Sequence, residues 1–133
     1  MLVPDASVIV DLLIDGGERG AWATEHIASA GRLHAPHVLD VEVVSALRNR
    51  LARGELSRSR ASEAVLELAE LPVRRYPAAP LLERIWQLRD RLTPYDAVYV
   101  ALAEALALPL LTTDGRLARA GGHTAEVVAF DPA

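Results

Sequence analysis

Several kinds of residue and segment are missing from this chain, and each absence narrows what it can do. It has no cysteine, which excludes disulfides, thiolate zinc sites and thiol catalysis. It has no lysine either, so a phosphate-binding loop that ends in lysine is excluded. Its most apolar stretch, 97–111, is too short for a bilayer and is interrupted by Glu104 and Pro109. Because the N-terminus also lacks a basic leader, the sequence predicts a soluble cytoplasmic protein.

What is present is typical of one folded domain, which we expect to span residues 1–133. Hydrophobic residues make up 51% and charged residues 24% of the chain, a balance found in globular rather than disordered proteins. A chain of this length supports one hydrophobic core. There is no internal repeat, low-complexity tract or linker that would indicate a second module.

Short runs typical of strands alternate with longer runs typical of helices. Strands are expected at 2–5, 33–35, 73–76, 110–112 and 126–130, and helices at 6–14, 18–30, 38–53, 57–71, 79–91, 93–107 and 115–120. This alternation predicts an α/β protein, a three-layer α/β/α sandwich with a short parallel sheet. Ligands of such sheets bind at the carboxyl ends of the strands.

Four acidic residues are candidates for a functional site at that edge. Asp5 and Asp114 each follow a short strand, although either could be only the N-cap of the next helix. Asp96 lies in Thr93-Pro94-Tyr95-Asp96, which could be only a capping box. Glu42 lies inside a helix beside the apolar stripe, where an acid is costly unless something pairs with it. A metal ion is one such partner.

The sequence contexts of these acids occur together in one known family. They are V-P-D-A-S, L-D-V-E-V-V-S-A-L-R, L-T-P-Y-D-A-V-Y-V-A-L-A and L-L-T-T-D-G-R-L. In this order and at this chain length they resemble the PIN-domain ribonucleases, specifically the VapC toxins of VapBC toxin–antitoxin pairs. The resemblance covers nearly the whole chain. One departure is Gly115, since relatives often carry a larger polar residue after the fourth acid.

The resemblance implies a role for each residue of the predicted site. Asp5 and Asp96 would be the principal metal ligands, and Glu42 and Asp114 would complete the cluster. Ser7 would hydrogen-bond within it. The remaining supporting residues would be Thr113, with a similar role, and Arg116, close enough to approach the scissile phosphate.

The implied reaction is hydrolysis of RNA phosphodiester bonds that leaves a 5′-phosphate and a 3′-hydroxyl. Oxygen ligands suit Mg²⁺ or Mn²⁺, and such an ion activates a bound water and neutralises developing charge. The implied partners are RNA, a cognate VapB-like antitoxin that covers the acidic crevice, and a second copy of the chain in a homodimer.

Net charge does not argue against an RNA substrate. The chain carries 14 arginines against 18 acidic residues, and setting aside the four site carboxylates leaves 14 of each sign. A further arginine cluster around Gly54 could contact RNA phosphates, or it could be a solvated helix end. Its members are Arg48, Arg50, Arg53, Arg58 and Arg60.

Three other interpretations of the acids are open to test. A phosphoryl-accepting receiver domain also places acids at strand ends, but it needs a lysine that this chain lacks. A structure-specific DNA nuclease of the same broad superfamily usually has insertions for which this chain has no room. A non-catalytic RNA- or partner-binding module would keep the fold without the activity, and retention of all four acids weighs against it.

Overall fold

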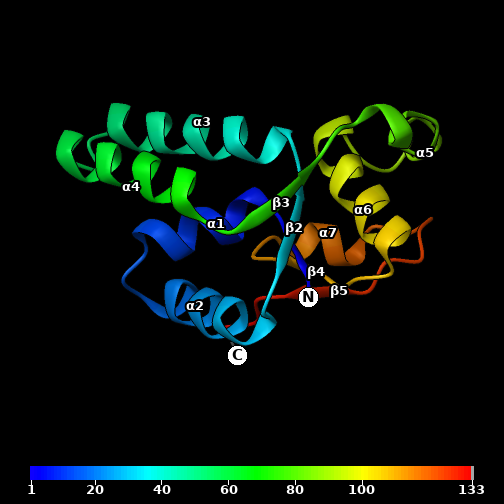
Figure 1. Cartoon of the computed structure of the whole chain (residues 1–133), viewed down its shortest axis with the longest axis horizontal. Coiled ribbons are helices and arrows are strands. Elements are labelled where there is room, and N and C mark those ends of the chain that lie inside the picture. The colour runs from blue at the N-terminus through cyan, green and yellow to red at the C-terminus, as the bar shows by residue number, and fades with distance from the viewer. Residues whose placement is uncertain (133) are drawn as a thin grey trace.

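The chain forms a parallel sheet between two layers of helices, as the alternating pattern predicts (Figure 1). The computed structural model describes residues 1–132. Its strands are β1 (Val3–Pro4), β2 (Leu33–Pro36), β3 (Val73–Tyr76), β4 (Leu110–Thr112) and β5 (Val127–Ala129). Its helices are α1 (Ala6–Ile14), α2 (Glu18–Ala30), α3 (Val38–Ala52), α4 (Arg58–Glu70), α5 (Leu82–Gln87), α6 (Pro94–Leu106) and α7 (Gly115–Arg119).

All strand pairings in the sheet are parallel. β1 pairs with β4 through Val3↔Leu110, β4 pairs with β5, and β2 pairs with β3. A single bridge, Leu2↔Leu33, joins the β1-β4-β5 and β2-β3 groups. The resulting order is β3-β2-β1-β4-β5. Each parallel connection therefore runs through a helix, which places helices on both faces.

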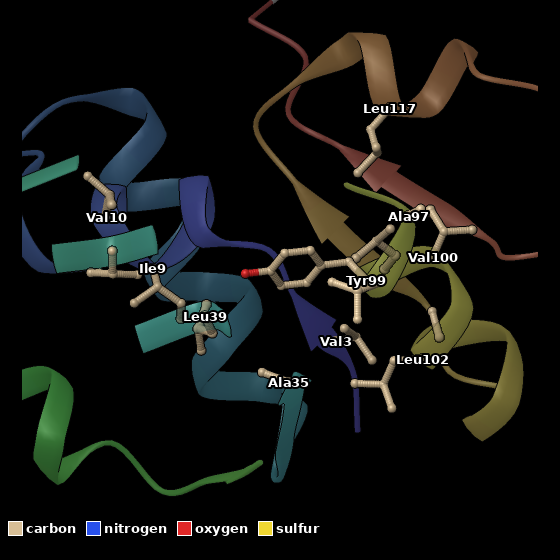
Figure 2. Close-up of a cluster of buried hydrophobic side chains, with 14 of the residues drawn as sticks. Val3, Ile9, Val10, Ala35, Leu39, Ala97, Tyr99, Val100, Leu102 and Leu117 are labelled. Atoms are coloured by element: carbon tan, nitrogen blue, oxygen red, sulfur yellow. The ribbon is translucent and has the colours of Figure 1, made fainter. Parts of the chain in front are cut away.

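Alternation along the short strands fills both faces of the sheet with apolar side chains. Leu2, Leu33 and Leu111 face one way and pack with Val8 of α1 and Ala23 of α2. A second and larger cluster packs around α6 and α3, and it includes Val3, Ala35, Leu39, Ala97, Val100 and Leu110. Figure 2 shows the Tyr99 ring inside this larger cluster, with its hydroxyl directed away from α6 and toward α1 and α3.

One expected element is shorter than the sequence suggested. The helix predicted over 79–91 is a 3₁₀ turn at Ala79–Leu81 followed by α5, which ends at Gln87. Leu88 is 2% exposed, and its N–H bonds to the carbonyls of both Arg84 and Ile85. Burial of Leu88 in the core tightens the chain there, and the following turn leads directly into α6. No helix within residues 1–132 is long and apolar enough to cross a membrane.

A bidentate ion pair ties α5 to α6 far from the strand ends. Arg84 donates from Nε and Nη2 to the two carboxylate oxygens of Glu104, at 2.8 and 2.9 Å. The Thr124 N–H donates to the same carboxylate at 2.9 Å. The Arg84 hydrogen bonds, followed by those from Thr124, lower the pKa of Glu104 to about 2. The carboxylate form of Glu104 therefore stabilises the folded state.

Replacing Glu104 with glutamine should destabilise the chain in a pH-dependent way. We expect a loss of about 1.5 kcal/mol near neutral pH, the low end for hydrogen bonds to a charged group. Because the folded pKa lies below the ordinary value of 4.5, this contribution is complete above that value and fades as the pH falls toward 2. Urea denaturation at several pH values measures the difference.

The matched control is Glu55→Gln, which removes the exposed Arg53–Glu55 pair and should change the free energy of unfolding little. A Glu104→Gln difference that did not shrink between pH 5 and pH 3 would contradict this account.

Candidate active site

The four predicted acids come from four different elements and meet at the carboxyl edge of the sheet. Asp5 follows β1, Glu42 lies on α3, Asp96 lies in the first turn of α6, and Asp114 follows β4. The charge of Asp96 raises the pKa of both Asp5 and Glu42. Asp114 in turn raises the pKa of Asp96. The fold therefore brings together all four acids named from the sequence.

Asp5 is the most buried and the most firmly held of the four. It is 8% exposed, and Oδ1 accepts hydrogen bonds from the Ser7 hydroxyl at 2.5 Å and the Val8 N–H at 3.2 Å. The hydrogen bond expected of Ser7 is therefore present. Burial raises the pKa of Asp5 against the effect of these hydrogen bonds. Asp5 caps α1 through Oδ1, and its second oxygen, Oδ2, takes no part in this cap.

Oδ2 of Asp5 is bound by Thr112, a residue that was not predicted from the sequence. The buried Thr112 hydroxyl donates to Asp5 Oδ2 at 2.5 Å and accepts from the Asp114 N–H at 2.9 Å. Thr113 contributes differently: its N–H donates to the Ser7 hydroxyl at 3.1 Å, and its side chain lowers the pKa of Asp11. The sequence does indicate such a role for Thr112, because a hydroxyl at the end of a buried strand must form a hydrogen bond.

Glu42 is held by a tyrosine on a distant helix. The Tyr99 hydroxyl donates to Glu42 Oε1 at 2.7 Å, and Figure 2 shows the ring crossing the core from α6. Burial raises the pKa of Glu42, and the nearby charges of Asp96 and Asp5 raise it further, against the Tyr99 hydrogen bond. A buried tyrosine hydroxyl needs a hydrogen-bond partner, so a tyrosine in the apolar helix that contains Tyr99 indicates a polar group nearby.

Asp96 does not form the capping box that could have explained it. Its N–H donates to the Thr93 hydroxyl at 3.3 Å, so Thr93 is the N-cap of α6. Burial, and then the charge of Asp114, raise the pKa of Asp96. The charge of Arg116 and the Thr93 side chain lower the pKa of Asp96, but they do not outweigh these opposing effects. Its negative charge is therefore poorly compensated.

Asp114 differs from the other three because an arginine neutralises it. Arg116 donates to the Asp114 carboxylate from Nη2 at 2.8 Å and from Nε at 3.1 Å. These hydrogen bonds lower the pKa of Asp114. The Arg116 side chain is 82% exposed, so it can leave this partner at little cost.

The donor set suits a hard divalent cation. It consists of carboxylate oxygens alone, and burial together with mutual repulsion raises the pKa of three of them. With the side chains as they stand, no three acidic or histidine side chains among residues 1–132 are close enough to hold a metal. A cation of charge two would relieve the repulsion.

Replacing Tyr99 with phenylalanine should affect both stability and the pH profile of the site. Loss of the hydroxyl leaves a half-buried Glu42 oxygen unpaired, at a cost of about 1–3 kcal/mol. It also removes a hydrogen bond that lowers the pKa of Glu42, so the acid limb of any activity that needs this carboxylate moves to higher pH. We expect activity to fall about 10- to 100-fold, as for other groups that orient a ligand.

Tyr76→Phe is the matched control, because it removes a tyrosine hydrogen bond to His34 (2.6 Å) elsewhere in the fold. It should lower the melting temperature without moving the pH profile. Identical profiles for Tyr99→Phe and the wild type would mean that Tyr99 has only a structural role.

Comparisons with known proteins identify the family of this chain. The family model described as "PIN domain" matches residues 2–123. Ribonuclease VapC12 of Mycobacterium tuberculosis is 42% identical over 127 residues, which cover 96% of this chain and 97% of that protein. Ribonuclease VapC1 of the same organism is 44% identical and covers 94% of each. The structure of VapBC2 from Rickettsia felis, bound to a DNA fragment from their promoter, shares the fold. It has a TM-score of 0.68 and 11% identity, and 98% of each chain is covered.

These matches extend over the whole region that carries the four acids. The chain therefore belongs to the PIN-domain family, and within it to the VapC group.

Proposed function

We propose that this chain is an endoribonuclease toxin that hydrolyses RNA phosphodiester bonds. The observation that carries the proposal is the crowding of four carboxylates around Asp96 at the carboxyl edge of the sheet. The similarity to Ribonuclease VapC12 and Ribonuclease VapC1 over more than nine tenths of the chain supports it. Burial and mutual repulsion of these carboxylates destabilise the folded state, which indicates a chemical role rather than a packing role.

The proposed cofactor is Mg²⁺, with Mn²⁺ as a substitute. Asp5 and Asp96 would be the principal ligands, with Glu42 and Asp114 completing the set. The ion would supply an activated water and neutralise charge that develops on the phosphate. The chain's own hydroxyls hold the ligands ready, since Ser7 and Thr112 orient Asp5 and Tyr99 orients Glu42.

Arg116 would then have two roles in sequence. In the metal-free state it neutralises Asp114. Because a cation competes for the same oxygens, metal binding would release the guanidinium. A released, exposed arginine two residues from the acid could contact a phosphate oxygen of the substrate.

The direct test is cleavage of RNA by the purified chain in Mg²⁺, followed by analysis of the product ends. We expect 5′-phosphate and 3′-hydroxyl termini. Binding of RNA without cleavage under all metal conditions would favour the alternative, a non-catalytic binding module with the same fold.

A cognate VapB-like antitoxin is the proposed partner, and helices α3 and α4 offer it a surface. Val41, Val44, Val65 and Leu66 are between 39% and 70% exposed, and a hollow between the two helices is lined by Val44, Leu47 and Val65. An amphipathic helix could bury this apolar strip. A basic side chain of the same partner could enter the acidic crevice and compete with the metal.

Saturation with the cognate VapB-like antitoxin should therefore abolish RNA cleavage. Val44→Asp should weaken the complex at least about tenfold, because it places a charge in the apolar strip, while cleavage by the free chain stays unchanged. Titration by calorimetry and a cleavage assay at saturation measure the two effects. A tight complex with undiminished cleavage would refute occlusion of the site. The proposed homodimer is tested separately by sedimentation, where a strictly monomeric chain would refute it.

A further inference from the structure

A charged cavity adjoins the four acids, and their proposed chemistry does not account for it. It has a volume of about 370 Å³ and opens between α1, α3 and the end of β4. Glu42 and Ser7 form one side of it, so it is continuous with the acid cluster. Its other polar lining residues are Asp11, Arg19, Arg50 and Thr113.

Asp11 is an almost fully buried acid at the wall of this cavity. It is 4% exposed and lies one helical turn after Ser7 on α1. The Thr113 side chain lowers the pKa of Asp11, and Arg50 Nη2 lies 3.9 Å from Asp11 Oδ1. The Thr113 N–H bonds to Ser7, which bonds to Asp5. Asp11 therefore lies beside the residues that hold the candidate metal ligand.

The two arginines retain unused hydrogen-bonding capacity. At 3.9 Å, Arg50 is too far from Asp11 for a hydrogen bond, and its charge also lowers the pKa of Glu55. Arg19 approaches Asp11 closely enough to lower its pKa and otherwise contacts the Phe130 ring at 5.9 Å. Two guanidinium groups therefore face the carboxylates of Asp11 and Glu42 in the cavity lining. Most of their N–H donors are free for an anion.

The other arginines of the cluster around Gly54 do not share this arrangement. Arg53 pairs with Glu55, and Arg60 pairs with Glu63 and Glu67. Arg48 and Arg58 line the separate hollow between α3 and α4. Of the five, Arg50 alone lines the cavity beside the acids. Among these five arginines, Arg50 is therefore the one placed to contact RNA beside the acids.

We propose that Arg50 and Arg19 bind a phosphate of the RNA next to the one that is hydrolysed. The inference rests on the proposed ribonuclease function. An RNA strand bound across the acid cluster must continue on at least one side of it. This cavity lies on one side of the cluster, and Arg19 and Arg50 line it. Arginine offers planar pairs of donors that match phosphate oxygens, and buried Asp11 holds the Arg50 guanidinium at the cavity. The subsite would set the direction in which RNA crosses the site.

The test measures binding of a short fluorescein-labelled single-stranded RNA in EDTA, by anisotropy over a range of salt concentrations. Arg50→Gln should weaken binding about 5- to 20-fold, and it should reduce the slope of log K against log salt by about 0.7, the value for one phosphate contact on a single strand. Arg19→Gln should have a smaller effect in the same direction, and Arg50→Lys should retain most of the slope.

Arg48→Gln is the matched control, because it removes the same charge from the same helix on the other side. It should change RNA affinity less than twofold. Equal effects of Arg48→Gln and Arg50→Gln would mean that only diffuse charge matters, and would overturn the subsite. So would unchanged RNA affinity in Arg50→Gln with a lower melting temperature, which would make Arg50 a structural partner of Asp11. If Arg50→Gln does not fold, Arg19→Gln and Arg50→Lys carry the same test.

The outcomes separate this inference from the proposed function. A wild-type chain that cleaves RNA, together with an Arg50→Gln variant that binds RNA normally, overturns the subsite alone. A wild-type chain that binds RNA in the predicted salt-dependent way but never cleaves it overturns the ribonuclease proposal. A wild-type chain that does not bind RNA overturns both.

Discussion

Asp96→Asn is expected to abolish RNA cleavage while leaving the fold at least as stable as the wild type. Burial and the charge of Asp114 raise the pKa of Asp96, and the Asp96 carboxylate repels both Asp5 and Glu42. Removing its charge should therefore raise the melting temperature in EDTA. Cleavage should fall more than about 100-fold, since loss of a ligand should exceed the effect of losing a group that orients one.

Asp5→Asn should give the same loss of cleavage for a related reason. Asparagine caps a helix about as well as aspartate, so the N-terminus of α1 should persist. Far-ultraviolet circular dichroism and thermal melting test the fold, and a single-turnover cleavage assay tests the activity. If either carboxylate were only a cap, its asparagine variant would cleave RNA normally, and that residue would be removed from the site.

Removal of divalent metal should have an effect as large as loss of these carboxylates. EDTA should stop cleavage, Mg²⁺ or Mn²⁺ should restore it, and Ca²⁺ should bind without supporting efficient turnover. The reason is the ligand set, which contains only carboxylate oxygens and carries unrelieved negative charge. Mg²⁺ should also stabilise the folded chain, by about 2.7 kcal/mol at a hundred times its dissociation constant.

Asp96→Asn is also the control for the metal experiment. The rise in melting temperature with Mg²⁺ should be much smaller in this variant than in the wild type, whereas Glu55→Gln, far from the site, should keep the full rise. Undiminished cleavage in excess chelator would contradict the metal-dependent mechanism. Rescue by zinc alone would show that zinc, and not Mg²⁺, is the cofactor.

The sequence by itself determined the order and nature of the elements, because the signals that define them are local. Asp5, Ser57 and Thr93 cap the helices that follow them, and Gly54 supplies the left-handed backbone just after α3 (φ 75°). The alternation of short apolar runs with helices then predicted the parallel sheet. The strand ends placed Asp5 and Asp114 at the same edge, and Glu42 and Asp96 were candidates from their places on helices. The resemblance to the PIN family then joined the four acids into one site.

The tertiary structure decided which side chains hold those acids and which ones oppose them. Thr112 rather than Thr113 bonds to Asp5, because successive residues of a strand point to opposite sides and packing of β4 against β1 sets which side is which. Tyr99 reaches Glu42 across 57 positions of sequence, and Arg50 meets Asp11 because α3 packs on α1. The rotational phase of one helix against another is fixed by core packing, which no local pattern encodes. The sequence therefore determined where the acids lie along the chain and their local partners, Ser7 and Arg116. Only packing between distant elements determined the partners Thr112 and Tyr99.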